Sequence, residues 1–152
     1  MIKMAVTSTQ TPTEPEARQT IQSLFSYLEA QGSADYIGEA ISQLEHSLQA
    51  AALAMEADAD EETIIAALLH DVGRFIPSAK DMPKMIAPDG TFVGTESHEI
   101  TGEKYLRSLG FSEKVCSIVG AHVWAKRYLC ATEPGYWESL SKSSKVTLEF
   151  QV

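Results

Sequence analysis

The stretch LLHDVG, residues 68–73, places a histidine and an aspartate side by side at the end of an apolar segment. Residues 61–69 are apolar on nearly every face, so the helix predicted there is buried. A buried carboxylate at Asp71 needs a cation or several hydrogen-bond donors. Imidazole and carboxylate are both good ligands for Fe, Mn or Zn, so the pair predicts a metal clamp. The alternative is a helix C-cap in which His70 interacts with the last carbonyl groups.

The chain on both sides of this stretch is predicted to be helical. Apolar residues recur at helical spacing, Asp60, Ser97 and Ser112 are expected to cap helices, and Gly residues follow several helix ends. The sequence has no strand-like alternation and no internal repeat, so the predicted class is all-α. The expected helices cover residues 15–30, 38–57, 61–69, 97–109 and 112 to about 131, with a short amphipathic one within 136–150.

Residues 72–96 differ in composition, because proline and glycine break any long helix there. The predicted loop is too apolar for a free linker. It is expected to form a pocket rim or a dimer contact, or to pack into the core of the same chain. Its apolar residues are Met82, Met85, Ile86, Phe92 and Val93.

The composition fits one cytoplasmic domain. The chain has 152 residues, a net charge of −9 and two cysteines. This acidic balance argues against nucleic acid and anionic membrane as partners. The sequence shows no apolar run long enough for a membrane span and no signal-peptide pattern. We expect residues 1–16 to form a mobile arm and residues 17–152 to form the domain.

The chemistry is concentrated in four histidines, His46, His70, His98 and His122, which all fall within or at the ends of predicted helices. A single histidine of this kind is more often a hydrogen-bonded core residue. Four such residues together with Asp71 exceed the needs of one tetrahedral ion. The set therefore predicts two metal ions, with Asp71 placed to bridge them.

Further motifs make the prediction of a two-metal site more specific. The His46, His70-Asp71, His98 and His122 pattern resembles the HD-domain superfamily of metal-dependent phosphohydrolases. Within it, the sequence resembles the mixed-valent diiron oxygenases that cleave the C–P bond of 1-hydroxyphosphonates. The finer matches are YIGE at 36–39, SQLEH at 42–46, HVWAKRYL at 122–129 and LSKSSKVTL at 140–148.

The resemblance implies an HD-domain helical bundle with two iron ions, Fe(II) and Fe(III), and O2 as co-substrate. It implies a small 1-hydroxy-2-aminoethylphosphonate-type substrate, cleaved to phosphate and glycine, or to glycine betaine from the trimethylammonium analogue. One iron would be held by His46, His70 and Asp71. The other would be held by Asp71, His98 and His122.

The resemblance also implies roles for residues around the metals. The residue matching Tyr36 binds iron when substrate is absent, and the residue matching Glu39 supports that lid and faces the substrate amine. Lys126, Ser144 and Thr147 match residues that surround the phosphonate. Without the resemblance, the simplest interpretation of Lys126 is a solvated residue at a helix end. Tyr36 would be an ordinary half-buried aromatic residue, and Glu39 would be a first-turn residue favoured by the helix dipole.

The family pattern continues beyond residues 147–151 to a late aspartate that ligates the first iron, and no aspartate follows Asp89 here. We therefore expect a domain that is incomplete at the C-terminus, either as a fragment of a longer protein or as a naturally shortened copy. If the chain ends at Val152, we expect weak iron binding at His46 and His70 and little oxygenase activity. The helix end at 147–152 is expected to fray, with the apolar face of Val146, Leu148 and Phe150 exposed or buried against a second copy.

Three functions follow from these patterns. The leading one is the oxygenase, and the second is an HD-type phosphohydrolase that uses a metal-activated hydroxide. The third is a shortened, inactive metal-binding homologue. We expect a monomer or a weak homodimer.

Overall fold

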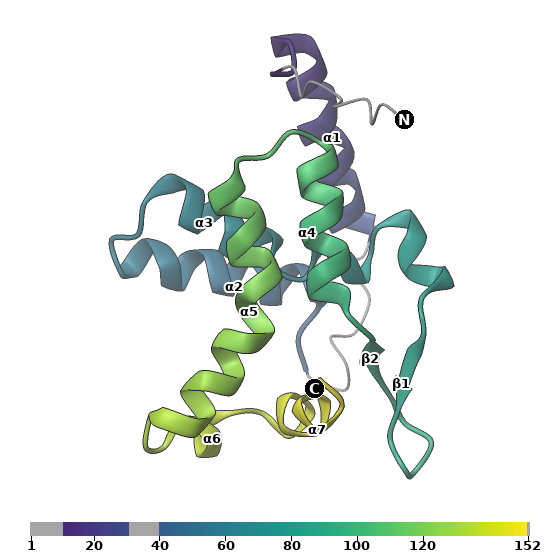
Figure 1. The fold of residues 1–152 in the computed structure, drawn as a ribbon, viewed down its shortest axis with the longest axis vertical. Coiled ribbons are helices and arrows are strands. Elements are labelled where there is room, and N and C mark those ends of the chain that lie inside the picture. The colour runs from purple at the N-terminus through teal and green to yellow at the C-terminus, as the bar shows by residue number, and fades with distance from the viewer. Residues whose placement is uncertain (1–10, 31–39, 152) are drawn as a thin grey trace, which may run out of the picture.

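The computed structural model describes residues 11–30 and 40–151, which are mainly helical (Figure 1). In the described residues the prediction of a helical fold is confirmed, apart from a small antiparallel sheet of β1 (Lys84–Ile86) and β2 (Phe92–Thr95). None of the described helices is long and apolar enough to cross a membrane. The helices are α1 (Glu14–Ala30), α2 (Gln43–Glu56), α3 (Glu61–Leu69), α4 (His98–Ser108), α5 (Glu113–Thr132), α6 (Tyr136–Ser139) and α7 (Lys142–Phe150), with 3-10 turns η1 (Val72–Arg74) and η2 (Pro77–Asp81).

The first helix begins earlier than the sequence predicts. The Thr13 backbone N–H and hydroxyl both donate to Glu16 Oε2, at 2.8 and 2.6 Å, and α1 starts at Glu14. A carboxylate three residues into a helix often satisfies the N-cap amide in this way. The helix therefore overlaps the end of the expected N-terminal arm at residues 14–16, and residues 1–10 lie outside the described part of the chain.

Side-chain caps set the starts of α2, α3 and α5. Ser42 and Glu45 form a reciprocal capping box, so α2 begins at Gln43 rather than at residue 38. Asp60 and Ser112 cap α3 and α5 as predicted. Ser97 precedes α4 but makes no side-chain cap, because it adopts a left-handed conformation with φ of 52°.

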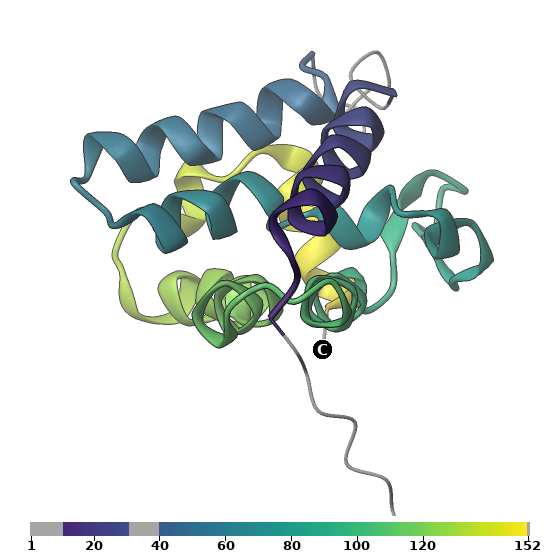
Figure 2. The same ribbon diagram turned by 90° about the horizontal axis from the view of Figure 1, so that it is seen from above.

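The core lies where α3, α4 and α5 meet. Figures 1 and 2 show α4 and α5 side by side, and α3 packs against α5 on one side and against α2 on the other. Burying this apolar surface is the main stabilising contribution to the fold. The residues that the core buries most fully are Leu28, Ala66, Val72, Leu106, Cys116 and Val119.

A close backbone contact joins η1 to α4. A Cβ atom added to Gly73 would lie 2.0 Å from the His98 carbonyl oxygen and 2.8 Å from the Gly102 nitrogen. Only glycine allows the two backbones to approach this closely. The contact fixes Asp71, two residues before Gly73, beside the start of α4.

The segment 72–96 packs partly into this chain. Met85, Ala87 and Val93 form a second apolar cluster, and Val146 and Phe150 of α7 pack against it. The expectation that the Val146 and Phe150 face is exposed or covered by a second copy is therefore wrong. It failed because the hairpin of β1 and β2, which covers this face, was predicted as a loop. Ile86 and Phe92 on the same hairpin remain about half exposed.

Replacing Gly73 with alanine tests the contact between η1 and α4. We expect Gly73→Ala to lower the free energy of unfolding by about 3 kcal/mol, because the new methyl group meets backbone atoms that cannot move aside. Urea denaturation measures the loss. The matched control is Gly90→Ala, where no atom lies within 4 Å and only a positive φ of 85° is strained, so the expected cost is about 1 kcal/mol. Equal losses in the two variants would contradict the close-contact account.

Candidate metal centre

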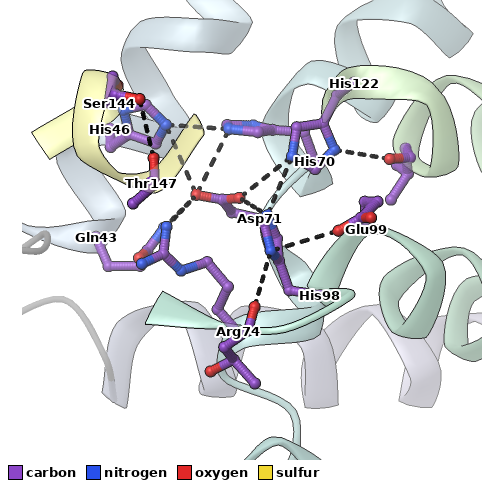
Figure 3. Close-up of polar contacts among 12 residues, drawn as sticks. Gln43, His46, His70, Asp71, Arg74, His98, Glu99, His122, Ser144 and Thr147 are labelled. Carbon is purple, nitrogen blue, oxygen red and sulfur yellow. Dashed lines mark hydrogen bonds and ion pairs between the residues drawn. The ribbon is translucent and has the colours of Figure 1, made fainter. Parts of the chain in front are cut away.

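Asp71 lies at the centre of four histidines that come from three helices and a helix end (Figure 3). His70 is the C-cap residue of α3, and Asp71 follows it at the turn into η1. The other three are His46 on α2, His98 at the first position of α4, and His122 on α5. The five predicted metal ligands are thus brought together.

The ligand atoms fall into two triads that share Asp71. Within each triad the candidate ligand atoms lie within 4.8 Å of one another. Asp71 Oδ2 lies 3.8 Å from His46 Nε2 and 3.7 Å from His70 Nε2. Asp71 Oδ1 lies 3.1 Å from His98 Nε2 and 3.6 Å from His122 Nε2. Each carboxylate oxygen therefore faces one pair of imidazoles.

Backbone carbonyls orient three of the rings. Nδ1 lies 2.7 Å from the Ala67 oxygen in His70, 3.2 Å from the Thr95 oxygen in His98 and 2.7 Å from the Val119 oxygen in His122. A carbonyl accepts from Nδ1–H, so the Nε2 atom of each ring presents a lone pair to the centre. Histidines that bind a metal through one ring nitrogen are commonly held by a hydrogen bond of this kind at the other.

The Nε2 atoms also meet in pairs at short range. His98 Nε2 and His122 Nε2 are 3.2 Å apart, and His46 Nε2 and His70 Nε2 are 3.0 Å apart. The lone pairs of His98 and His122 repel each other unless a proton or a metal cation lies between them. Burial lowers the pKa of His46 to about 4 and that of His122 to about 3, which disfavours the proton. The donor set therefore fits two divalent cations.

Asp71 stays ionised although it is buried. Burial by itself would raise its pKa, but the electrostatic effect of His70, Arg74 and His98 holds the pKa well below its usual range. Arg74 donates to Oδ2 at 3.2 Å, and the Gln43 side-chain amide donates to the same oxygen at 3.4 Å. These two donors were not predicted. Both lie three residues from a predicted ligand, Gln43 before His46 and Arg74 after Asp71, and that spacing is the signal that could have found them.

A pocket of about 210 Å³ opens on the metal centre. Its wall includes all three residues that the sequence predicted around a phosphonate, namely Lys126, Ser144 and Thr147. Ser144 and Thr147 of α7, labelled in Figure 3, line this pocket together with His46. The wall also contains residues that the sequence reasoning missed: Arg74, Tyr136, Leu140, Ser143 and Gln151.

Two features of the pocket bear on what it binds. Burial lowers the pKa of Lys126, because its ammonium group is removed from water. Gln151 Oε1 is buried and has no hydrogen-bond partner among the described residues. A buried, unpaired acceptor favours a ligand that brings a donor. Tyr36 and Glu39, the predicted lid and amine contacts, lie outside the described residues.

The buried histidines make the stability of the metal-free protein depend on pH. The unfolded chain has ordinary histidines, so it binds more protons than the folded chain below pH 6.5, and stability falls as the pH falls. At pH 5, His46 and His122 are each expected to lower the free energy of unfolding by about 2 kcal/mol. Urea denaturation in a chelator at pH 7, 6 and 5 measures it, and His122→Gln should flatten the profile by about half. Constant stability across this range would contradict the burial of neutral imidazoles.

The comparisons with known proteins agree with this arrangement. The HD domain pattern matches residues 44–133, which contain all five candidate ligands. A hydroxymethylphosphonate dioxygenase of Gimesia maris is 37% identical over 134 residues, 88% of this chain and 63% of its own length. A [1-hydroxy-2-(trimethylamino)ethyl]phosphonate dioxygenase (glycine-betaine-forming) of Leisingera caerulea is 38% identical over 120 residues, 79% of this chain and 58% of its own.

A third relative carries no functional name. Uncharacterized protein L432 of Acanthamoeba polyphaga mimivirus is 39% identical over 133 residues, 88% of this chain and 58% of its own length. This chain thus spans about three fifths of the length of the relatives it matches. The HD pattern itself covers more than half of the chain and ends at residue 133, directly after α5. The chain belongs to the HD-domain family.

Proposed function

We propose that this chain forms the diiron centre of an oxygenase that cleaves the C–P bond of a small 1-hydroxyphosphonate. The observation that carries the proposal is the pair of ligand triads sharing Asp71, set in a pocket that also contains Lys126 and Arg74. Two relatives named as phosphonate dioxygenases support it.

The candidate ligands would bind two metal ions, as two sets that share Asp71. His46, His70 and Asp71 would hold one iron, and Asp71, His98 and His122 the other. When bound, the metals would supply the oxygen activation and the polarisation of substrate oxygens that side chains cannot provide. The carbonyls of Ala67, Thr95 and Val119 would keep the three rings turned so that Nε2 faces the metals.

Lys126 and α7 would hold the phosphonate. Lys126 lies four residues after His122 on α5, so both side chains project from one face of the helix and line the same pocket. A phosphonate dianion beside the Lys126 ammonium group would supply negative charge and hydrogen-bond acceptors in place of the water that burial removes. Ser144 and Thr147 would add hydroxyl contacts from the opposite wall, and Gln151 Oε1 would accept from a substrate donor.

The nature of the substrate end group depends on residues outside the described part of the chain. By the resemblance, Tyr36 would occupy a metal position until substrate arrives, and Glu39 would face an amine or a trimethylammonium group. The names of the two relatives include a substrate with no amine and one with a quaternary ammonium. The proposal therefore covers three substrates: hydroxymethylphosphonate, 1-hydroxy-2-aminoethylphosphonate and the trimethylammonium analogue of the latter.

The reaction balances with one molecule of oxygen. A 1-hydroxyphosphonate, R–CH(OH)–PO3H2, and O2 give R–COOH and H3PO4. The C–P and C–H bonds break, the carbon loses four electrons, and O2 accepts them and supplies both added oxygen atoms. Oxygen uptake and phosphate release must therefore be equal.

A single-turnover experiment tests this balance. Purified protein, loaded with Fe(II) without oxygen and held in excess over each of the three phosphonates, is mixed with oxygenated buffer. Oxygen consumption and free phosphate are measured. Because the protein is in excess, a single turnover gives a measurable amount of product even if the reaction is slow. We expect one phosphate released for each O2 consumed with at least one substrate. Phosphate release from a phosphate ester without oxygen uptake would instead identify a phosphohydrolase.

Lys126→Gln separates phosphonate binding from the chemistry when the same two products are followed in the steady state, with phosphonate varied and in excess over protein. A charge-assisted hydrogen bond contributes about 1.5–3 kcal/mol, so KM is expected to rise roughly 10- to 100-fold and kcat to change less. Lys104→Gln is the matched control, because Lys104 is exposed on α4 away from the pocket. A fall in kcat with unchanged KM would contradict the binding role of Lys126.

A further inference from the structure

The two metal positions differ in how the shared carboxylate is used. Asp71 Oδ2, which faces His46 and His70, also accepts from Arg74 at 3.2 Å and from Gln43 at 3.4 Å. Its negative charge is therefore shared with a guanidinium group and an amide. A carboxylate oxygen that already accepts from a cation is a weaker donor to a metal.

The other carboxylate oxygen has different surroundings. The polar contacts that the structure gives Asp71 Oδ1 are those to His98 Nε2 at 3.1 Å and His122 Nε2 at 3.6 Å. No Arg or Lys contact to Oδ1 is found among the described residues, whereas Arg74 lies against Oδ2. Its charge is thus directed at the His98 and His122 position.

A second carboxylate stands behind His98. Glu99 Oε2 lies 3.5 Å from His98 Nδ1, on the side of the ring away from the metal position, and the Glu99 side chain is only 14% exposed. This oxygen is buried, and it makes no hydrogen bond of normal geometry within the described part of the chain. The Thr95 carbonyl lies 3.2 Å from the same ring nitrogen. The His98 N–H is therefore placed between a carbonyl and a buried negative charge.

We propose that Glu99 is a positioning residue for His98 and that it makes the His98 and His122 position the tighter of the two, so that this position fills first. A carboxylate facing the far nitrogen of a ligating imidazole raises the basicity of the coordinating nitrogen. On the other side, Arg74 donates to Asp71 Oδ2 at 3.2 Å, which places a cation beside the His46 and His70 position. Nearby cations repel a metal, so the charges on both sides favour the same order. The inference rests on the proposed two-metal centre but does not depend on which reaction that centre performs.

Stepwise metal titration tests this order. Metal-free protein is titrated with Co(II) in the absence of oxygen and phosphonate, and binding is followed by calorimetry and by the visible absorption of cobalt. We expect two separate steps. His46→Ala should keep the tighter step, and His122→Ala should lose it.

Substitution of Glu99 tests its role directly. Glu99→Gln keeps the size of the side chain and removes its charge, and we expect a roughly 10- to 100-fold loss of affinity in the tighter step with little change in the weaker one. Glu99→Ala, which suits a helix, should give the same loss. Glu103→Gln is the matched control on α4, because Glu103 pairs with Arg107 at 2.6 Å outside the pocket.

Two results would overturn the proposal. One is a tighter step that Glu99→Gln and Glu99→Ala leave unchanged, and the other is a tighter step that survives in His122→Ala. Neither result bears on the oxygenase, because the titration contains no oxygen or phosphonate. Conversely, ordered binding of two metals without phosphonate oxidation would remove the oxygenase proposal and leave the role of Glu99 standing.

Discussion

The buried carboxylate of Asp71 is the group around which the molecule is arranged. An ionised side chain at 2% exposure is stable only when positive charge and hydrogen-bond donors surround it. The chain supplies Arg74 and Gln43 at one oxygen, and four imidazoles complete the shell. Because His70, His98 and His122 present lone pairs to the centre, Arg74 and Gln43 are the donors left to balance the buried charge, and metal cations would complete that balance.

The fold can be understood as the means of bringing the imidazoles to that carboxylate. Gly73 and Gly102 let η1 approach α4 at backbone distance, which sets Asp71 beside His98. The pairing of α4 with α5 then brings His122 to His98, and the pairing of α2 with α3 brings His46 to His70. Two helix pairs thus provide two halves of the centre, and Asp71 joins them.

The sequence identifies the candidate ligands because their signals are local. LLHDVG combines an apolar helix, a ligand pair and a helix-ending glycine within six residues, and α3 has the predicted limits. Gln43 and Arg74 were missed because a spacing of three residues from a candidate ligand is shared by many surface residues and does not by itself identify a supporting side chain. Their roles appear only when α2 and η1 are brought against the same oxygen.

The errors at the hairpin and at Ser97 have the same origin. Residues 84–86 and 92–95 form strands through pairing with each other and packing against α7, not through any alternation that the sequence displays. Ser97 has a residue type that favours helix caps, but the turn from β2 into α4 places it in a left-handed conformation. In both places tertiary contacts override local preference.

The most direct test of the account is where metal binds relative to Asp71. Crystals of the protein grown with Fe(II) in the absence of oxygen allow anomalous diffraction at the iron edge to locate each ion. The account predicts two peaks on opposite sides of the Asp71 carboxylate, one beside the Nε2 atoms of His46 and His70 and one beside those of His98 and His122. A single peak, or iron bound away from Asp71, would contradict a two-metal centre bridged by this residue.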